Sequence, residues 1–162
     1  MSGVHNATNW LDNPFWQYSL RQYSQPGCAQ FLLDAQDQKH LDVNILLFIG
    51  WVSSQNLLLP NKRLLNRAVF LNRLLIRPIR LLRRISKQTT PNLVYQWIKR
   101  IELKAEQLEQ GILHGIAHKL MSHLENELCF EKNMQMYLAG KVVDDTWLQA
   151  LKQYLQPDNG TN

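Results

Sequence analysis

Two histidines in the second half of the chain have a spacing that could hold a metal ion. His114 and His118 are four residues apart, so on a helix they would share a face, with Glu125 two turns further along. A competent metal site needs three or four converging ligands, and no HExxH pattern accompanies the pair. We therefore interpret both histidines as part of a solvated polar face, and we predict no metal site.

Three carboxylates could in principle support acid–base chemistry. Glu102, Glu106 and Glu109 fall on one helical face, but carboxylates spaced by one turn are usually solvated or paired with cations. No nucleophile elbow surrounds any serine or cysteine, and the seven glycines are too scattered to form a phosphate-binding loop. We find no catalytic constellation and expect a protein that is not an enzyme and needs no cofactor.

The strongest pattern in the chain is a basic, amphipathic stretch from Arg63 to Lys87. Its candidate polyanion-binding residues, which recur at helical spacing, are Arg73, Arg77, Arg80, Arg83, Arg84 and Lys87. Apolar residues with the same spacing fall on the opposite side, at Leu64, Ala68, Leu71, Leu75, Leu82 and Ile85. The pattern predicts a helix whose apolar face packs inward and whose cations face solvent. Pro78 should kink or interrupt it.

The charge distribution allows several partners for this basic face. The net charge is +5, and the span from residue 43 to residue 101 contains eleven Lys or Arg and no Asp or Glu. The cations could remain solvated, with some paired to Glu102, Glu106 and Glu109 across an antiparallel turn. They could instead bind RNA or DNA phosphates or an acidic protein. An anionic membrane surface is less favoured, because the apolar stripe should be used by the core.

Composition and cysteine content place the chain among ordinary globular proteins. It has 162 residues, 45% hydrophobic and 19% charged, which suits one domain. Cys28 and Cys129 are far apart and form no CxxC motif, so we interpret them as buried free thiols, with a structural disulfide as the alternative. No signal peptide is apparent, and the longest apolar run, residues 45–52, is too short to span a bilayer. We expect a cytoplasmic protein.

The spacing of apolar residues and capping signals predicts the remaining elements. Asp12 or Asn13 caps a first helix that begins at Pro14, ends near Ser24 and buries Phe15, Trp16, Leu20 and Tyr23. A second helix runs from Pro26 to near His40 and buries Ala29, Ala35 and either Leu32 or Leu33. Asp42 caps a third helix, residues 43–55, which is apolar nearly all round and should be central. Asn44 is its exception. Its side chain could be satisfied by a neighbouring backbone group or simply occupy a polar position of the first turn, or it could be a buried contact to a ligand.

The second half of the chain predicts two further helices and no strand. A long helix begins at Pro91, and its apolar seam runs from Val94 to Leu128. After a C-cap at Gly140, Asp144 or Asp145 caps a last helix that ends at Leu155. The predicted fold is therefore all-α, a compact single-domain bundle of about six helices over residues 12–156. Residues 1–11 and 157–162 should be flexible.

Several short motifs resemble the signature of a family of short bacterial proteins classified as a domain of unknown function. The first half of the match, residues 13–51, contains FWQYSLRQY, a PG turn, a QD pair at Gln36 and Asp37, and LDVNILLF. The second half contains RPIR followed by Arg83 and Arg84, and then ELKAE at residues 102–106. The resemblance covers residues 13–110 and implies a helical, cytoplasmic bacterial protein. It implies no activity.

These observations support two hypotheses about function. The first is a non-enzymatic binding module whose basic helical face contacts RNA or another polyanion. The alternative is a structural or adaptor protein that engages a protein partner, or a second copy of itself, through the long helix.

Overall fold

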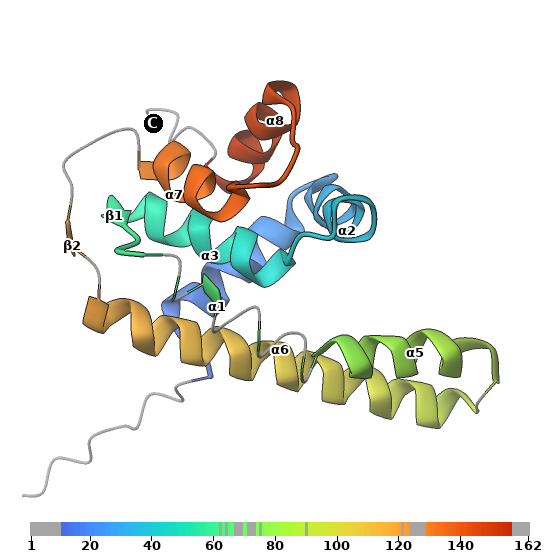
Figure 1. Ribbon diagram of the computed structural model, residues 1–162. Helices are drawn as coiled ribbons and strands as arrows, with labels where there is room; N and C mark the ends of the chain where they lie inside the picture. Colours follow the sequence, from blue (N-terminus) through green and yellow to red (C-terminus); the bar gives the residue numbers. More distant parts are fainter. Residues whose placement is uncertain are drawn as a thin grey trace, which may run out of the picture.

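The computed structural model describes residues 11–61, 63, 65–66, 70, 74, 76–89, 91–120, 122–123 and 129–156. These residues form seven helices and two very short strands, which confirms the all-α class (Figure 1). The elements are α1 (Pro14–Ser24), α2 (Cys28–Lys39), α3 (Val43–Ser54), β1 (Leu57–Leu58), α5 (Arg77–Thr89), α6 (Asn92–Leu120), β2 (Ser122–His123), α7 (Cys129–Leu138) and α8 (Asp145–Leu155). Apart from Leu11, the ends predicted to be flexible lie outside the described residues.

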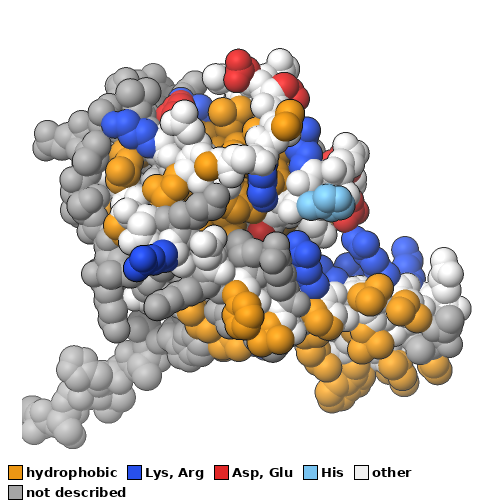
Figure 2. Space-filling model, in the orientation of Figure 1, with side chains coloured by type: hydrophobic (Ala, Val, Ile, Leu, Met, Phe, Trp, Pro, Cys, Tyr) orange, Lys and Arg blue, Asp and Glu red, His pale blue; other side chains and the backbone are white. Residues whose placement is uncertain are grey.

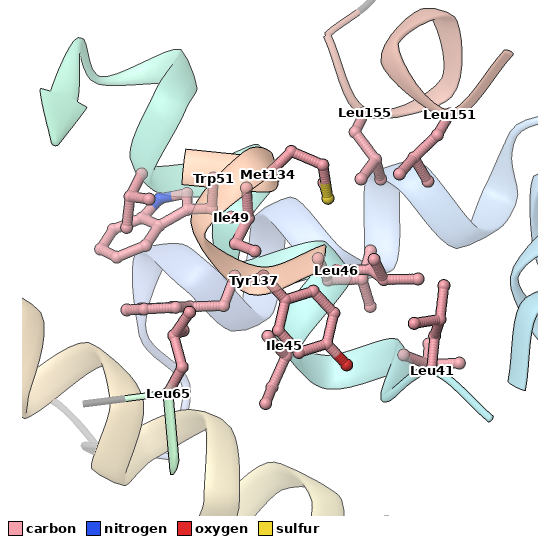
Figure 3. Packing of buried hydrophobic residues seen from close by; sticks show 14 of the residues in the cluster. Leu41, Ile45, Leu46, Ile49, Trp51, Leu65, Met134, Tyr137, Leu151 and Leu155 are labelled. Atoms are coloured by element: carbon pink, nitrogen blue, oxygen red, sulfur yellow. The ribbon is translucent and has the colours of Figure 1, made fainter. Parts of the chain in front are cut away.

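The apolar helix α3 lies at the centre, as its sequence predicts. Every residue from Val43 to Ser53 is buried, and α3 contacts α1, α2, α6, α7, α8 and β1. Figure 3 shows its side chains packed against those of α7 and α8; among those labelled are Ile45, Ile49, Met134, Tyr137 and Leu155. The predicted cap is also confirmed, because the Asp42 carboxylate accepts a hydrogen bond from the Asn44 backbone N–H at 3.0 Å.

Helix α1 begins as predicted but buries a partly different face. The Asn13 side chain accepts a hydrogen bond from the Trp16 N–H at 3.0 Å, and Phe15 is fully buried. The buried face continues through Tyr18, Ser19 and Gln22, whereas Leu20 and Tyr23 are exposed. Polar residues are tolerated inside because they find partners: Tyr18 donates to the Leu155 carbonyl and Ser19 to the Phe15 carbonyl.

Helix α2 begins two residues later than predicted. Gly27 precedes it with a φ of 83°, a left-handed conformation that glycine adopts without steric cost. The helix ends after Lys39, close to the predicted His40, and Leu32 and Ala35 are buried. Leu33 is exposed, so the choice between the two leucines is settled in favour of Leu32.

The region after α6 differs from the prediction of one helix with a seam reaching Leu128. Helix α6 ends at Leu120, and β2 then pairs antiparallel with β1, Leu57 opposite His123. The prediction of no strand is therefore wrong for these two residue pairs. The buried Asn133 of α7 explains the position of β1, because its amide donates to the Leu57 carbonyl and accepts from the Leu59 N–H, both at 2.9 Å. The two hydrogen bonds of this amide hold β1 in place, and a strand of two residues is too short to show the alternating pattern of a longer strand.

Helix α5 and the first half of α6 form an arm that projects beyond the other helices (Figure 1), while α6 also contacts α1 and α3. Helix α5 lies beside the first half of α6, with the loop between them at the far end of the arm. Pro78 is the second residue of α5, where a missing N–H costs no intrahelical hydrogen bond. Just before it, Leu74 and Ile76 have π-helical geometry. The regular α-helical geometry of α5 therefore begins beside Pro78, directly after residues with π-helical geometry.

The predicted orientation of α5 is wrong. Its apolar residues Leu81, Leu82 and Ile85 are 60%, 52% and 55% exposed. The side turned toward the protein instead carries Ser86, which is buried, and Arg80, whose side chain is only 13% exposed. The other apolar positions of the predicted stripe, 64, 68, 71 and 75, lie outside the described residues.

Candidate functional site: the α5–α6 arm and the adjoining cleft

Ion pairs to α6 hold two of the predicted polyanion-binding arginines. The Arg80 guanidinium lies 2.5 Å from Glu106 Oε1 and 3.4 Å from Glu102 Oε1. It also donates to the side chain of Gln36 on α2. Arg83 donates to the second carboxylate oxygen of Glu102. Internal pairing of the basic face, one of the alternatives left open by the sequence, is confirmed for these two arginines.

Burial and charge act in opposite directions on Arg80. Burial lowers the pKa of its guanidinium, but the carboxylates of Glu106, Asp42 and Glu102 outweigh this effect and raise the pKa above its ordinary value. Arg80 is thus a fixed cation that is already neutralised within the fold. Because its charge is already balanced, Arg80 attracts a phosphate less strongly than an unpaired cation would.

The predicted polyanion-binding residues do not form one unpaired cationic face. Arg80 and Arg83 are paired with α6, and the remaining residues differ from one another. Arg84 lies 2.8 Å from Asp37 of α2, in a pair whose two side chains are more than half exposed. Arg77 and Lys87 are exposed and form no ion pair with any described residue. Arg73 lies outside the described residues.

An extended apolar surface covers the outer side of the arm. Its exposed residues, which we call the arm face, are Leu81, Leu82, Ile85, Val94, Trp97 and Ile101. Figure 2 shows hydrophobic side chains gathered over both helices of the arm, with cations along its upper edge. The exposed charges nearby on α6 are all basic, namely Lys99, Arg100 and Lys104. The acids of this part of α6, Glu102 and Glu106, are paired inward with Arg80 and Arg83.

A cleft of about 170 Å³ opens where α1, α3 and α6 meet beside Arg80. Buried Val43 and Leu47 line it, and the half-exposed Leu20 and Leu103 border it. Much of its lining comes from the motifs that carry the family resemblance: Trp16, Ser19, Leu20 and Tyr23 from FWQYSLRQY, Val43, Asn44 and Leu47 from LDVNILLF, Arg80 from RPIR, and Leu103 and Glu106 from ELKAE. Motifs separated by ninety residues in the chain therefore converge on one site.

Two buried side-chain amides line this cleft. The Asn44 amide nitrogen donates to Glu109 Oε2 at 2.5 Å, and the Gln110 amide nitrogen donates to Asn44 Oδ1 at 2.9 Å. Asn44 is therefore a satisfied buried polar group, the first of its two sequence interpretations. Glu109 binds this asparagine, whereas the sequence suggested that it could pair with arginine.

A second cleft, of about 200 Å³, lies between the end of α2 and the start of α5. Arg77, Arg80 and Arg84 line it together with Asp37 and Asp42, so opposite charges largely balance. Burial raises the pKa of Asp42, and the nearby guanidiniums of Arg80 and Arg77 only partly oppose this. Three arginines thus face two aspartates in this cleft, and one of them, Arg80, is also paired with Glu106, which does not line it.

The histidines and cysteines contribute less. The His114 ring packs against the Trp51 ring, with centroids 5.3 Å apart, and the side chain of His118 lies outside the described part of the chain. The described residues contain no group of three potential metal ligands. Cys28 and Cys129 are buried free thiols, as predicted. Burial raises the pKa of Cys28 to about 11, which keeps this thiol protonated and unreactive at neutral pH.

Comparison with known proteins agrees with the motifs. Residues 14–113 match the model of a family described as a protein of unknown function, DUF2390. The chain belongs to this family. No curated protein and no solved structure gave a significant match. Within the described residues, no helix is long and apolar enough to cross a membrane.

The DUF2390 match covers every motif that lines the cleft, but the sequence did not indicate which residues these motifs would meet. Gln36 and Asp37, evident only as a QD pair, bind the arm arginines, and Gln110 completes the amide pair. Gln110 had a usable signal, because it lies one residue from Glu109 and four from Glu106 on the same helix. The sequence carried no signal for the contact between α2 and α5, because these two helices are distant in the chain.

Proposed function

We propose that this protein is a non-enzymatic adaptor that engages a protein partner through the arm face. The observation that carries the proposal is the exposure of apolar side chains along both α5 and α6. Large exposed apolar patches on a folded protein commonly mark interaction sites. The two buried free cysteines are consistent with a bacterial cytoplasmic location, which we include in the proposal.

The charge around the arm face favours a partner with acidic residues beside an apolar surface. Arg100 and Lys104 are exposed on α6, and Lys104 falls three residues from Ile101 and four from Leu108. A second copy of the chain would bring basic arms together, which is unfavourable. An acidic, apolar segment of another protein complements both properties of the arm.

Site-specific photo-crosslinking in cells tests this proposal. A photoreactive amino acid at Leu82 on the arm face should give an adduct with another protein, and the crosslinked peptide should contain apolar and acidic residues. The double change Ile85→Ser and Trp97→Ser should abolish the adduct. The matched control carries the photoreactive group at Leu33, an exposed leucine of α2 outside the arm face.

Three outcomes would reject the adaptor. Adducts between copies of this chain alone would replace it with self-association. Binding to phosphatidylglycerol vesicles that is lost in the same double variant would replace it with a membrane contact. Equal adduct yields at positions 82 and 33 would show that the arm face has no special role.

Polyanion binding is the second candidate, and the exposed Arg77 and Lys87 favour it. The double change Arg77→Gln and Lys87→Gln should weaken binding of a labelled mixed-sequence RNA, and it removes no ion pair between described residues. Removing one phosphate contact should reduce the log–log salt slope by about 0.7. Fluorescence anisotropy at several salt concentrations measures this, and an unchanged slope would eliminate these two residues as RNA contacts.

A further inference from the structure

We propose that the cleft between α1, α3 and α6 binds a small, uncharged, aromatic molecule that carries one hydrogen-bond donor. This inference concerns a site separate from the arm face and does not depend on the adaptor function. The cleft volume of about 170 Å³ sets the size of the ligand. A buried apolar cavity of about 150 Å³ is enough to hold benzene, so this cleft suits one or two rings.

The walls favour an apolar body. Its apolar lining residues include Val43 and Leu47, which are buried, and Trp16 and Leu103, which are more exposed. Aliphatic and aromatic side chains with a few placed polar groups are typical of small-molecule sites. The indole ring of Trp16 can pack against a flat ring at the usual aromatic distances.

The charges favour a neutral ligand. Arg80 and Glu106 both line the cleft, and they form an ion pair with each other at 2.5 Å. Their charges cancel within the wall, so neither a carboxylate nor an ammonium group would find an uncompensated partner. A charged ligand would lose its hydration without recovering that energy.

The amide of Gln110 accounts for the hydrogen-bond donor. Its nitrogen is used in donating to Asn44, and its oxygen is buried without a donor among the described residues. The hydroxyl of Ser19, another lining group, already donates to the Phe15 carbonyl. Buried acceptors almost always have a donor, and Gln110 lines the cleft, so an N–H or O–H group of a ligand bound there would complete its hydrogen bonding.

The shape of the rim separates this proposal from simple core packing. Leu20 and Leu103 are both about half exposed and leave the cleft open, although either is large enough to cover the buried residues below it. A region used only for packing would place these apolar side chains over the floor. The open rim gives a small molecule a route to Asn44 and Gln110.

Nuclear magnetic resonance with two matched probes tests the site. The full chain, labelled with ¹⁵N, is titrated with indole and separately with benzothiophene, which has the same two-ring shape without an N–H group. Indole should give saturable shifts of the Asn44 and Gln110 side-chain amides and of the Trp16 indole N–H. It should bind at least tenfold more tightly than benzothiophene. No saturable shift with either probe, or equal affinity for both, would overturn the proposal.

Variants provide an independent test. Leu20→Trp should fill the cleft and weaken indole binding at least tenfold, whereas Leu33→Trp, on a leucine of similar exposure outside the cleft, should leave it unchanged. Gln110→Leu should remove the preference for indole over benzothiophene. If that variant fails to fold, the probe pair and the tryptophan variants still decide the question. Unaltered binding by Leu20→Trp would place indole elsewhere and reject the cleft.

Discussion

Helix α3 and helix α5 use apolar residues in opposite ways. In α3 the apolar side chains are buried on all sides, and the helix forms the centre of the core. In α5 the apolar side chains face outward, and the arginines Arg80 and Arg83 face the acids of α6. The difference teaches that helical periodicity identifies the faces of a helix, while the neighbouring helix decides which face is inside.

The reversal in α5 follows from what α6 presents to it. Glu102 and Glu106 lie on the side of α6 nearest α5, and a carboxylate in that position requires a cation. Meeting that requirement turns the apolar side chains outward. The helices packed around α3 are therefore stabilised mainly by apolar burial, whereas the orientation of α5 against α6 depends on paired charges.

The largest effect should come from removing an aromatic ring from the core. Phe48 is fully buried and its ring meets Phe15 edge to face at a centroid distance of 5.3 Å. Phe48→Ala should lower the free energy of unfolding by about 3–5 kcal/mol. Ile85→Ala, which truncates an arm-face residue, should change it by about 0.5 kcal/mol or less. Urea denaturation measures both, and similar losses would show that the arm face is covered in solution.

Two helical glycines should respond in opposite directions to the same change. A Cβ at Gly50 of α3 would lie 2.9 Å from Leu155 Cβ and would also clash with the Tyr18 hydroxyl, so Gly50→Ala should destabilise by about 1–3 kcal/mol. A Cβ at Gly115 of α6 would meet nothing within 4 Å. Gly115→Ala should therefore stabilise by about 0.5–1 kcal/mol through helix propensity. Thermal unfolding compares the two, and a shift of the same sign in both would contradict the packing at Gly50.

The next smaller effects on the free energy of unfolding should distinguish a buried ion pair from an exposed one. Glu102→Gln leaves Arg80 and Arg83 without their shared carboxylate and should cost about 1–2 kcal/mol. Asp37→Asn removes the exposed pair with Arg84 and should cost about 0–1 kcal/mol. Denaturation at low and high salt separates the two pairs, because salt screens only the exposed one strongly. Equal costs would mean that Glu102 does not anchor the arm.

The parts of the fold that the sequence predicts correctly depend on local signals. Asn13, Asp42 and Asp144 cap their helices as their positions before apolar runs indicate. The burial of α3 follows from its composition alone. The motif resemblance likewise identified the family over nearly the same residues as the family model.

The parts that it misses depend on contacts between distant residues. The position of β1 is fixed by Asn133, 76 residues from Leu57 in the chain, and two-residue strands have no periodicity to detect. The sequence offered pairing of the arginines with Glu102 and Glu106 as one alternative, but it did not indicate that this pairing would turn the apolar face of α5 outward. The cleft depends on a local signal and on a distant contact. Asn44 was recognisable as a polar residue in an apolar helix, whereas nothing in the sequence indicated that Gln110 would be its partner.

The smallest effect concerns Asp42. It compares a buried carboxylate directly with the paired charges of the arm. Burial raises the pKa of Asp42, so the folded state holds this proton more tightly than the unfolded state, whose value is near 3.8. Stability from this group is therefore present at low pH and declines as the pH rises above 3.8. Asp42→Asn keeps a side-chain oxygen for the Asn44 N–H but cannot ionise. It should be slightly more stable than the parent at pH 7, and this advantage should disappear below pH 3.8. Asp42→Ala cannot ionise either, so it should show the same pH dependence, lowered throughout by the loss of about 1 kcal/mol of cap stability. Urea midpoints from pH 3 to pH 8 measure this, and a parent that gains on Asp42→Asn as the pH rises would mean that Arg80 stabilises the Asp42 carboxylate more than burial penalises it.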